Sequence, residues 1–376
     1  MTLIVAEPTY RDAEHAPTNA VFAQILAGHA VCLAATPTQY DAIAAVAPGV
    51  ALPPHTSITV VSPGGVTLHR MHAQWRTLSV LVAHHGGTKL LLLSAGPETL
   101  FVARALVTRH PALTIHAIMH GNMADLAGWR SRDPRRRLID LRAGLGYANH
   151  PRIHLVVLED YIATAAHRGS PVWRGIPNAL RIWPHPTLAQ EEPAPREWSP
   201  RSRLRLTVPG IANREKGFDT ILALAADAPQ HDWFVTGRLD AEYRDAPIPA
   251  APGRLSRPDY LAALRSADYA VLAHQPAYDL TASASILDCA TNGIPLIALH
   301  SPAVDALTAA HGPLGYSVPD RAAALALLHS PALQDRDAYA RFQNAAAALH
   351  RSRTAAALAP LLHRDLGIKP LDLPGA

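Results

Sequence analysis

The sequence predicts an α/β protein with two doubly wound domains, each built on a parallel sheet. Short apolar runs recur along the whole chain, and they are continuous rather than alternating. Gly, Pro or Asp and then a helix-like segment follow each run, which is typical of parallel strands covered on both faces. At 376 residues the chain is too long for one ordinary hydrophobic core. A stretch rich in Pro, Glu and Ser, residues 185–202, divides it near the middle.

The apolar runs give the expected strands in chain order. In the first half they lie at residues 2–6, 30–35, 57–62, 89–94, 113–119 and 153–159. In the second half they lie at residues 203–210, 232–237, 269–274 and 295–300. The Ala- and Leu-rich tail from about 335 to 366 has helical spacing. We therefore expect a first domain at 1–186, a linker at 187–202, a second domain at 203–345, and a C-terminal helix at 346–376 that can pack back on the first domain.

Composition limits the class of protein. An apolar content of 49% with 17% charged residues excludes a disordered chain. Cys32 and Cys289 lie far apart and without metal-ligand spacing, so neither a disulfide framework nor a zinc site is predicted, and a cytoplasmic protein is expected. The start "MTLIVAEPTY" lacks a basic signal-peptide region, and no apolar run approaches the roughly 20 residues of a membrane span. The net charge of +4 permits an anionic ligand, nucleic acid or a membrane surface and selects none of them.

The first segment with chemical character is "RLTVPGIANREKGFDTILALA", residues 205–225. An apolar strand leads into Gly210 and then into a polar turn that carries Arg214 and Lys216. Cations after a parallel strand lie at the carboxyl edge of the sheet, where open α/β sheets bind ligands. Arg and Lys together suit a diphosphate, because one makes bidentate contacts and the other is a point charge. A solvated turn whose charges cancel is the alternative.

The second such segment is "YDLTASASILDCATNGIPLIAL", residues 278–299. Ser285 can cap a helix, and Asp288 three residues later completes a pattern like a capping box. A helix N-terminus offers free N–H donors and partial positive charge, so it attracts phosphate. The small residues Ser283 and Ala284 would leave room for such a ligand. Between the two segments, Gly237 ends the strand "FVTG", where backbone can approach a base or ribose, and a helix capped by Ser256 leads into "YAVLAH".

The order of these pieces resembles the nucleotide-binding half of a GT-B glycosyltransferase of family 4, a family that also builds bacterial surface polysaccharides and glycolipids. The matching pieces are "PGIANREKGFD", "FVTG", "YLAALRSADYAVL" and "YDLTASASILDCATNGIPLIAL", which together cover about residues 205–300. Looser agreement in the first half comes from "ILAGHAVCLAAT", "LTIHAIMHGN" and "HLVVLEDYIATAAHRG". The resemblance implies two Rossmann-like domains that face a central cleft, the first for the acceptor and the second for the nucleotide-sugar.

The resemblance also implies roles for individual residues. Lys216 matches the phosphate-binding lysine, and Asp288 takes the place of the second glutamate of the family's Glu-x7-Glu motif, which holds the ribose. His120 matches the histidine that faces the donor sugar, although a turn histidine after a buried strand is an equally good interpretation. The remaining donor-binding candidates are Gly210, Arg214, Gly237, Ser283, Ala284 and Ser285.

The sequence departs from the family pattern at three places. Ile211 replaces the arginine that follows the first glycine, and Leu280 replaces the first glutamate, with Asp279 one residue out of register. The Gly-Gly loop after the first strand is replaced by "AEPTYRDAEHAPTN", residues 6–19. These departures make direct contacts to the donor sugar less well supported than the diphosphate pocket.

The expected chemistry is transfer of a sugar from a nucleotide-sugar, such as a UDP- or GDP-sugar, without a cofactor. No Asp-x-Asp metal motif follows a strand, so a metal-independent reaction is predicted. The family resemblance favours retention, which needs no strong protein base. An inverting reaction would need a carboxylate or histidine, for which Asp125, Glu14 and His15 are the candidates. The acceptor is then a saccharide or a lipid-linked saccharide.

The basic run 129–142 is either a solvated face or a patch for peripheral contact with the inner membrane face. A DNA-base glycosyltransferase of phage type would make nucleic acid a partner, and steeply salt-dependent duplex binding would reveal it. A non-catalytic GT-B-like subunit that binds a nucleotide or a partner is consistent with the missing arginine and carboxylate.

Overall fold

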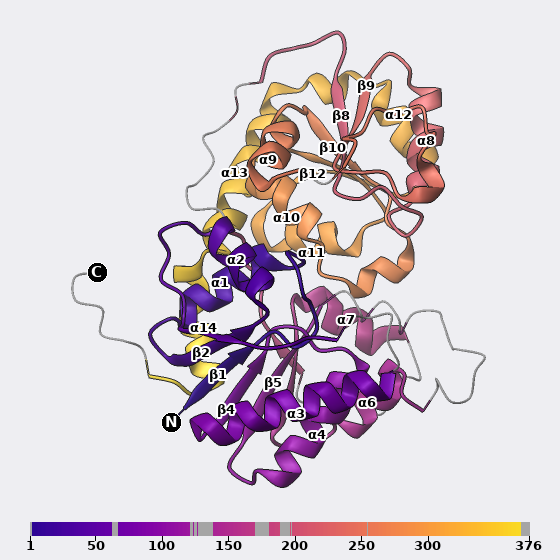
Figure 1. Cartoon of the computed structure of the whole chain (residues 1–376). Helices are drawn as coiled ribbons and strands as arrows, with labels where there is room; N and C mark the ends of the chain where they lie inside the picture. The colour runs from indigo at the N-terminus through magenta and orange to yellow at the C-terminus, as the bar shows by residue number, and fades with distance from the viewer. Residues whose placement is uncertain are drawn as a thin grey trace, which may run out of the picture. The chain divides into compact units, whose positions relative to one another are not determined.

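The computed structural model describes residues 2–61, 67–120, 123, 126, 138–169, 180–188, 196, 198–253 and 255–369 (Figure 1). The candidate Asp125 and residues 129–137 of the basic run lie outside these residues, as does most of the predicted linker. The chain forms two compact units. Unit 1 comprises residues 1–188, 280–282 and 353–376, and unit 2 comprises 189–279 and 283–352.

Unit 1 contains a parallel sheet of seven strands in the order β3-β2-β1-β4-β5-β6-β7. The strands are β1 (Leu3–Ala6), β2 (Ala30–Ala35), β3 (His55–Ser57), β4 (Lys89–Leu92), β5 (Thr114–Met119), β6 (Ile153–Val157) and β7 (Leu180–Ile182). The helices are α1 (Ala16–Leu26), α2 (Pro37–Val46), α3 (Thr67–His85), α4 (Pro97–Arg109), α6 (Leu141–Tyr147), α7 (Asp160–Gly169) and α14 (Ala355–Leu366). The strand order reverses between β1 and β4, so the carboxyl ends of these two strands form the switch point where such sheets bind ligands.

Helices cover both faces of this sheet, as continuous apolar strands require. Figure 1 shows α3, α4 and α6 on one face and α1, α2 and α14 on the other. The last helix, α14, packs against α1 and buries Leu358, Leu362 and Leu366 in the same core as Phe22 and Trp183. The C-terminal segment is therefore part of the core of unit 1.

Unit 2 contains a parallel sheet of five strands in the order β12-β11-β10-β8-β9. The strands are β8 (Arg205–Pro209), β9 (Asp232–Thr236), β10 (Tyr269–Leu272), β11 (Leu296–Leu299) and β12 (Gly315–Val318). The α-helices are α8 (Phe218–Asp227), α9 (Arg257–Arg265), α10 (Ala284–Thr291), α11 (Pro302–His311), α12 (Arg321–Leu328) and α13 (Arg336–Ser352), and short 3-10 turns are η3 (Ala241–Tyr243), η4 (Pro276–Leu280) and η5 (Pro331–Gln334). Here the order reverses between β8 and β10.

The α/β class with parallel sheets is confirmed, and two details of the expected strands are wrong. The strand predicted at 57–62 is displaced: β3 ends at Ser57, and residues 58–61 continue from there as a loop. Two strands, β7 and β12, were not predicted. Both lie at sheet edges and are short and partly exposed, so they lack the continuous apolar run that marks a central strand.

Candidate functional site

The loop from β8 to α8 crosses the switch point of the second sheet. Gly217, at φ +68°, lies so close to the chain after β10 that an added Cβ would be 1.8 Å from the Ala273 carbonyl oxygen. The Gln275 amide donates to the Glu215 carbonyl at 2.9 Å, which ties the same two loops together. Only glycine allows this approach, and it places the neighbouring Lys216 at the carboxyl edge of the sheet.

Lys216 is directed toward the start of α10. Its Nζ donates to the Ser285 Oγ at 3.0 Å and to the Pro209 carbonyl at 3.4 Å. Gly210 provides the space beside them, because a Cβ there would be 2.9 Å from Nζ and 3.0 Å from Oγ. Within the described part of the chain, Lys216 forms no ion pair with a carboxylate. Its positive charge is therefore available to an anion.

The first turn of α10 is built differently from the prediction. The N-cap is Ser283, whose hydroxyl accepts from the Ile286 amide at 3.4 Å, and the expected N-cap role of Ser285 is wrong. Ser283 has an extended backbone and Ala284 is already helical, so Ser285 lies inside the first turn. Its hydroxyl is thereby left to contact Lys216. The amides of Ala284 and Ser285 come before the first amide that donates to the Ser283 carbonyl, that of Ile286, and they carry the partial positive charge of the helix start.

Gly237 brings a third strand end to the same place. An added Cβ at this residue would be 2.2 Å from the Gly210 carbonyl oxygen, and its φ is +136°. The Gly210 amide also donates to the Thr236 carbonyl at 2.7 Å. The strand ends of β8 and β9 are thus in direct backbone contact beside Lys216.

Arg214 is not part of this group. Its side chain is 74% exposed, and its guanidinium forms an ion pair with Glu242 at 3.0 Å. The two cations of the loop therefore have different surroundings. Lys216 is hydrogen-bonded to Ser285, whereas Arg214 lies at the surface and is paired with Glu242. A diphosphate contact by Arg214 would need that surface pair to open.

Asp288 is held by a residue that the sequence reasoning missed. Arg257 donates to both of its carboxylate oxygens, at 2.8 and 2.6 Å, from the start of α9. The Ser256 N-cap was predicted and is confirmed by its bond from the Asp259 amide at 3.2 Å. Arg257 comes next in the chain, so its place at the helix start was readable, although its partner was not. The Tyr260 side chain also hydrogen-bonds Asp288, so the carboxylate of Asp288 is engaged by two side chains of α9.

His274, two residues after the end of β10, was also not singled out. Burial and then the charge of Lys216 lower the pKa of His274 to about 3. The ring packs against Tyr278 with centroids 4.3 Å apart. The imidazole is therefore neutral near pH 7 and adds a hydrogen-bonding group, without charge, close to Lys216.

In unit 1, Glu7 organises the loop after β1. Its buried carboxylate accepts from the amides of Thr9 and Tyr10, at 3.0 and 3.1 Å. It also accepts from the Ser94 hydroxyl at 2.7 Å and the Asn19 side-chain amide at 3.1 Å. Burial raises the pKa of Glu7 to about 7, although the hydrogen bonds act in the opposite direction. Glu7 follows β1 and Ser94 follows β4, so this contact spans the switch point of the first sheet.

His15 and His120 lie against each other, with ring centroids 4.2 Å apart and planes at 27°. His15 caps α1 in a left-handed conformation at φ 58°. The His120 Nε2 lies 2.8 Å from the Leu93 carbonyl oxygen. Because a carbonyl can only accept, Nε2 carries the proton and Nδ1 keeps its lone pair.

Both rings are neutral near pH 7. Burial, followed by the nearby His185, lowers the pKa of His15 to about 4. Burial, followed by His15 and His185, holds the pKa of His120 well below its ordinary value. The structure thus brings two of the predicted residues together. Glu14 lies beside them with an exposed side chain, its Oε1 4.0 Å from the His15 Nε2.

The described residues contain no cluster of three or more His, Cys, Asp or Glu side chains suited to hold a metal ion. No helix among those same residues is long and apolar enough to cross a membrane.

Solved structures are similar to this chain over nearly its whole length. Sucrose-phosphate synthase from Thermosynechococcus elongatus matches with a TM-score of 0.71 at 15% identity, over 98% of this chain and 99% of that chain. HepE from Anabaena, in complex with UDP and glucose, matches with a TM-score of 0.67 at 12% identity, over 98% and 99%. A glycosyltransferase from Rickettsia africae matches with a TM-score of 0.64 at 11% identity, over 97% of each chain.

Coverage is almost complete on both sides, and this decides the architecture. The chain has the GT-B fold. Units 1 and 2 correspond to the two Rossmann-like domains of the GT-B fold. No protein-family model and no curated protein matches the sequence. The comparisons therefore show the GT-B fold and do not show membership of family 4.

Proposed function

We propose that the protein is a glycosyltransferase that takes its sugar from a nucleoside diphosphate donor. The observation that carries this proposal is the group formed by Lys216, Ser285 and Gly210 at the switch point of unit 2. Among the residues that the structure describes, this ammonium has no carboxylate partner, and with a hydroxyl and the first turn of a helix it suits a diphosphate. The GT-B fold supports the same conclusion, and the similar HepE structure was solved with UDP and with UDP-glucose.

The chemistry follows from where charge develops. As the bond between the sugar and the diphosphate breaks, negative charge grows on the departing phosphate oxygen. Lys216 and the amides at the start of α10 are fixed before the reaction and would stabilise that charge. Such a group needs no metal ion, so we propose a metal-independent reaction. Gly237 and Asp288 would contact the nucleoside, the latter through its carboxylate, which Arg257 and Tyr260 hold in place.

We further propose that the configuration of the sugar is retained. An inverting enzyme needs a base with a pKa near the working pH. The pKa of His15 is about 4 and that of His120 is also far below its ordinary value, so both are weak bases. The pKa of Glu7 is about 7, but both of its carboxylate oxygens already accept hydrogen bonds within unit 1. In a retaining reaction the departing phosphate can take the proton of the acceptor. The anomeric configuration of the product, measured by proton NMR before it equilibrates, tests this directly: inversion would contradict it.

For the acceptor we propose a saccharide or lipid-linked saccharide of a bacterial surface polysaccharide. The basic run 129–142 would then contact the inner membrane face from the cytoplasm, because lipid-linked sugars carry phosphate. Most of that run lies outside the described residues, so the support is its composition. Replacing several of its arginines should weaken binding to anionic liposomes, and unchanged binding would rule this contact out.

One observation favours a second candidate, a non-catalytic subunit that binds a nucleotide or a partner. Asp288 is already paired with Arg257, and the position of the other expected carboxylate is Leu280, which is buried. A donor that binds without ever releasing its nucleotide would identify this second function.

The experiment that tests the proposal is a binding titration with UDP, GDP, TDP and their common sugar conjugates. One nucleoside diphosphate should bind, and Lys216→Ala should weaken it. The control is Arg203→Ala, which also removes a cation from unit 2 but at the exposed pair with Asp232. Absence of binding by every compound would contradict the proposal.

A further inference from the structure

The C-terminal end of helix α14 lies against basic side chains of the sheet in unit 1. Four neighbouring strands, β4, β5, β6 and β7, contribute one each, and this basic row consists of Lys89, His116, His154 and Arg181. The row contacts the helix directly, because Lys89 donates to the Leu366 carbonyl. The Trp183 indole, which follows β7, donates to the Asp365 carboxylate at 2.9 Å. Polar contacts therefore attach the end of α14 to the sheet.

These contacts are electrostatically complementary only while the histidines are neutral. The last carbonyls of a helix carry partial negative charge, and Asp365 is the one acidic residue in the sequence of α14. Lys89 and Arg181 supply the permanent positive charges of the row. Each histidine that takes up a proton would add a positive charge that Asp365 alone has to balance.

His116 is the most enclosed member of the basic row. Its side chain is 1% exposed. Its ring centroid lies 4.7 Å from that of His154 and 6.1 Å from that of Trp183, on which it stacks. Neither of its nitrogens has a well-oriented hydrogen-bond partner among the described residues. A proton added here would thus have no acceptor while α14 stays in place.

The groups around the two histidines act mostly in one direction. Burial, followed by His154 and Lys89, lowers the pKa of His116 to about 3. Burial, followed by Arg181, lowers the pKa of His154. Asp365 opposes both shifts, through its backbone at His116 and its charge at His154. Both histidines are therefore neutral near pH 7 while the helix is docked.

A second pair of histidines joins α14 to the end of α1. The ring of His363 packs edge-on against that of His29, with centroids 4.7 Å apart, and its Nε2 lies 3.4 Å from the Ile25 carbonyl oxygen. The His29 Nε2 is buried and has no hydrogen-bond partner in the described part of the chain. Burial, followed by His363, lowers the pKa of His29. The contact with α1 thus also favours neutral histidines.

Helix α14 depends on this docking for its own stability. It has 12 residues and contains Pro360, which removes a backbone hydrogen bond from the helix interior. Isolated helices shorter than about 12–15 residues are marginal in water. Its stability therefore comes from the apolar side chains that it buries in unit 1, Leu358, Leu362 and Leu366.

We propose that α14 is an acid-sensitive element: protonation of the histidines beneath it, chiefly His116, releases the helix from the sheet while the rest of unit 1 stays folded. This inference does not depend on the glycosyltransferase function proposed above. Release would expose the apolar side chains of α14 and the face of the sheet around Trp183.

The direction of the effect follows from proton binding. With the helix released, His116 returns to its ordinary pKa of 6.5, so the docked state binds fewer protons than the released state. The docked state is fully stable above about pH 6.5 and loses stability as pH falls below that value. For His116 alone, the docking equilibrium should shift roughly 30-fold between pH 7.5 and pH 5.0.

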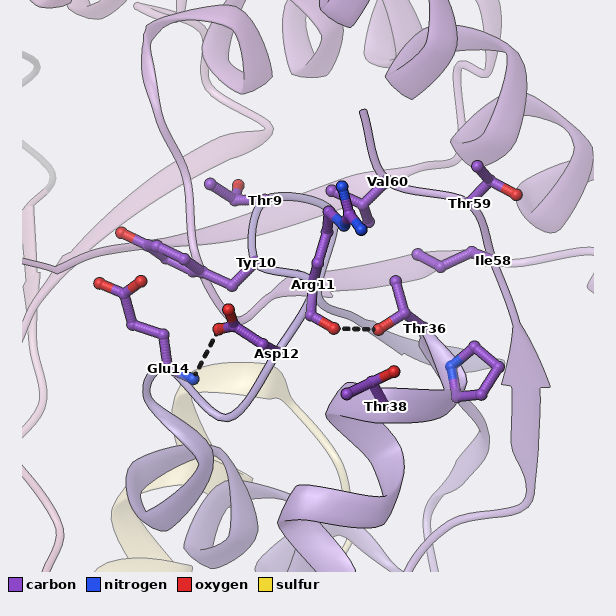
Figure 2. Close-up of a pocket in the computed structure, with 11 residues that line it drawn as sticks. Thr9, Tyr10, Arg11, Asp12, Glu14, Thr36, Thr38, Ile58, Thr59 and Val60 are labelled. Atoms are coloured by element: carbon purple, nitrogen blue, oxygen red, sulfur yellow. Dashed lines mark hydrogen bonds between the residues drawn. The ribbon is translucent and has the colours of Figure 1, made fainter. Parts of the chain in front are cut away.

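A separate part of unit 1 shows whether release is local. A pocket of about 630 Å³ lies at the carboxyl ends of β1 and β2 (Figure 2). Two of its loops are joined by the Thr36 hydroxyl, which caps α2 and donates to the Arg11 carbonyl at 2.6 Å. The described residues that line this pocket include no member of the basic row. Helix α2 and, on the other face of the sheet, α4 should therefore stay folded when α14 is released.

The test is hydrogen exchange of the full-length protein at pH 7.5 and pH 5.0, read by mass spectrometry and corrected for the pH dependence of intrinsic exchange. Protection of α14 should fall roughly 30-fold at pH 5.0, while α2 and α4 keep theirs. His116→Phe keeps a ring against Trp183 but cannot titrate, so most of this fall should disappear. The matched control is His69→Phe, an exposed position of α3, which should respond as wild type does.

Asp365→Asn is a second variant should His116→Phe fail to fold. It removes the one carboxylate of α14, so protection of the helix should already be lower at pH 7.5. Equal protection of α14 at both pH values would overturn the proposal. Joint loss of protection in α2, α4 and α14 would do the same, because the whole unit would then be unfolding. An unchanged pH response in His116→Phe would exclude His116 as the chief sensor.

Discussion

The Lys216 ammonium donates a hydrogen bond of 3.0 Å to the hydroxyl of Ser285. The two residues come from different segments at the carboxyl edge of one sheet, and the Cβ-free face of Gly210 lies against both. An anion in this position would meet a lysine charge, a hydroxyl and the start of a helix at once. The proposed donor site depends on this contact.

Replacement of Lys216 by Ala should weaken binding of the nucleoside diphosphate by roughly 10- to 100-fold, the range for loss of one charge-assisted hydrogen bond. The melting temperature should change little. Lys216 forms no ion pair among the described residues, so its replacement leaves none of their carboxylates without a partner. Isothermal titration calorimetry beside thermal melting measures both quantities. Equal affinity in Lys216→Ala and wild type would remove Lys216 from the site.

Gly210→Ala should also weaken donor binding, by filling the space rather than by removing charge. Its Cβ would lie 2.9 Å from the Lys216 Nζ and 3.0 Å from the Ser285 Oγ, and its φ of +78° disfavours any side chain. Gly253→Ala is the control, because a Cβ there meets nothing within 4 Å. If both variants bind the donor as wild type does, the ligand does not approach Gly210.

Asp288→Asn should reduce affinity for UDP while it leaves affinity for inorganic pyrophosphate unchanged, provided that Asp288 contacts the ribose. The same change weakens the ion pair with Arg257. The side chains of Arg257 and Asp288 are only 24% and 16% exposed, so the free energy of unfolding should fall by about 1–3 kcal/mol. Urea denaturation gives the stability, and competition titrations give the two affinities. A proportional loss for both ligands would instead indicate a structural role in the donor site.

Glu7 should make the stability of the protein fall as pH rises. Its pKa is about 7 in the folded protein against an ordinary 4.5, so the folded state holds this proton over a range in which the unfolded state has lost it. The stabilisation is complete below about pH 4.5 and is lost by pH 7, and it amounts to up to about 3 kcal/mol.

The matched variant for this effect is Glu7→Gln, whose side chain does not titrate. Urea unfolding at pH 5 and pH 8 should show a larger loss of stability in wild type than in the variant. Histidines with lowered pKa values, such as His116, make the protein less stable as pH falls, which is the opposite pH dependence. The effect of Glu7 is therefore the difference between the pH profiles of wild type and variant. Parallel pH profiles would contradict the account of Glu7.

The central strands were predictable from the sequence because continuous apolar runs such as "AVCLAA" correspond to strands buried on both faces. The edge strands β7 and β12 were not, since side chains there remain partly exposed and the apolar signal is weak. The N-cap of α10 was misplaced from Ser283 to Ser285 because both serines satisfy the same local rule. The choice between them depends on the path of the loop, which the sequence does not contain.

The candidate site was predictable where backbone geometry dictates residue type. Gly210 and Gly237 follow strand ends and lie so close to neighbouring atoms that a side chain at either position would clash. Contacts between distant segments were not predictable. The sequence does not show that Arg257 forms an ion pair with Asp288. It also does not show that Arg214 pairs with Glu242 instead of lying beside Lys216. Each of these pairs joins residues about 30 positions apart through the packing of separate loops, as shown by their separations of 31 and 28 residues.

The most direct test of the central claim is turnover of a nucleotide-sugar panel, with released nucleoside diphosphate measured in the presence of simple saccharide acceptors. We predict release from one donor, loss of that release in Lys216→Ala, and its persistence in Arg203→Ala. If no donor releases its nucleotide with any acceptor, or if Lys216→Ala is as active as wild type, the protein is not the glycosyltransferase proposed.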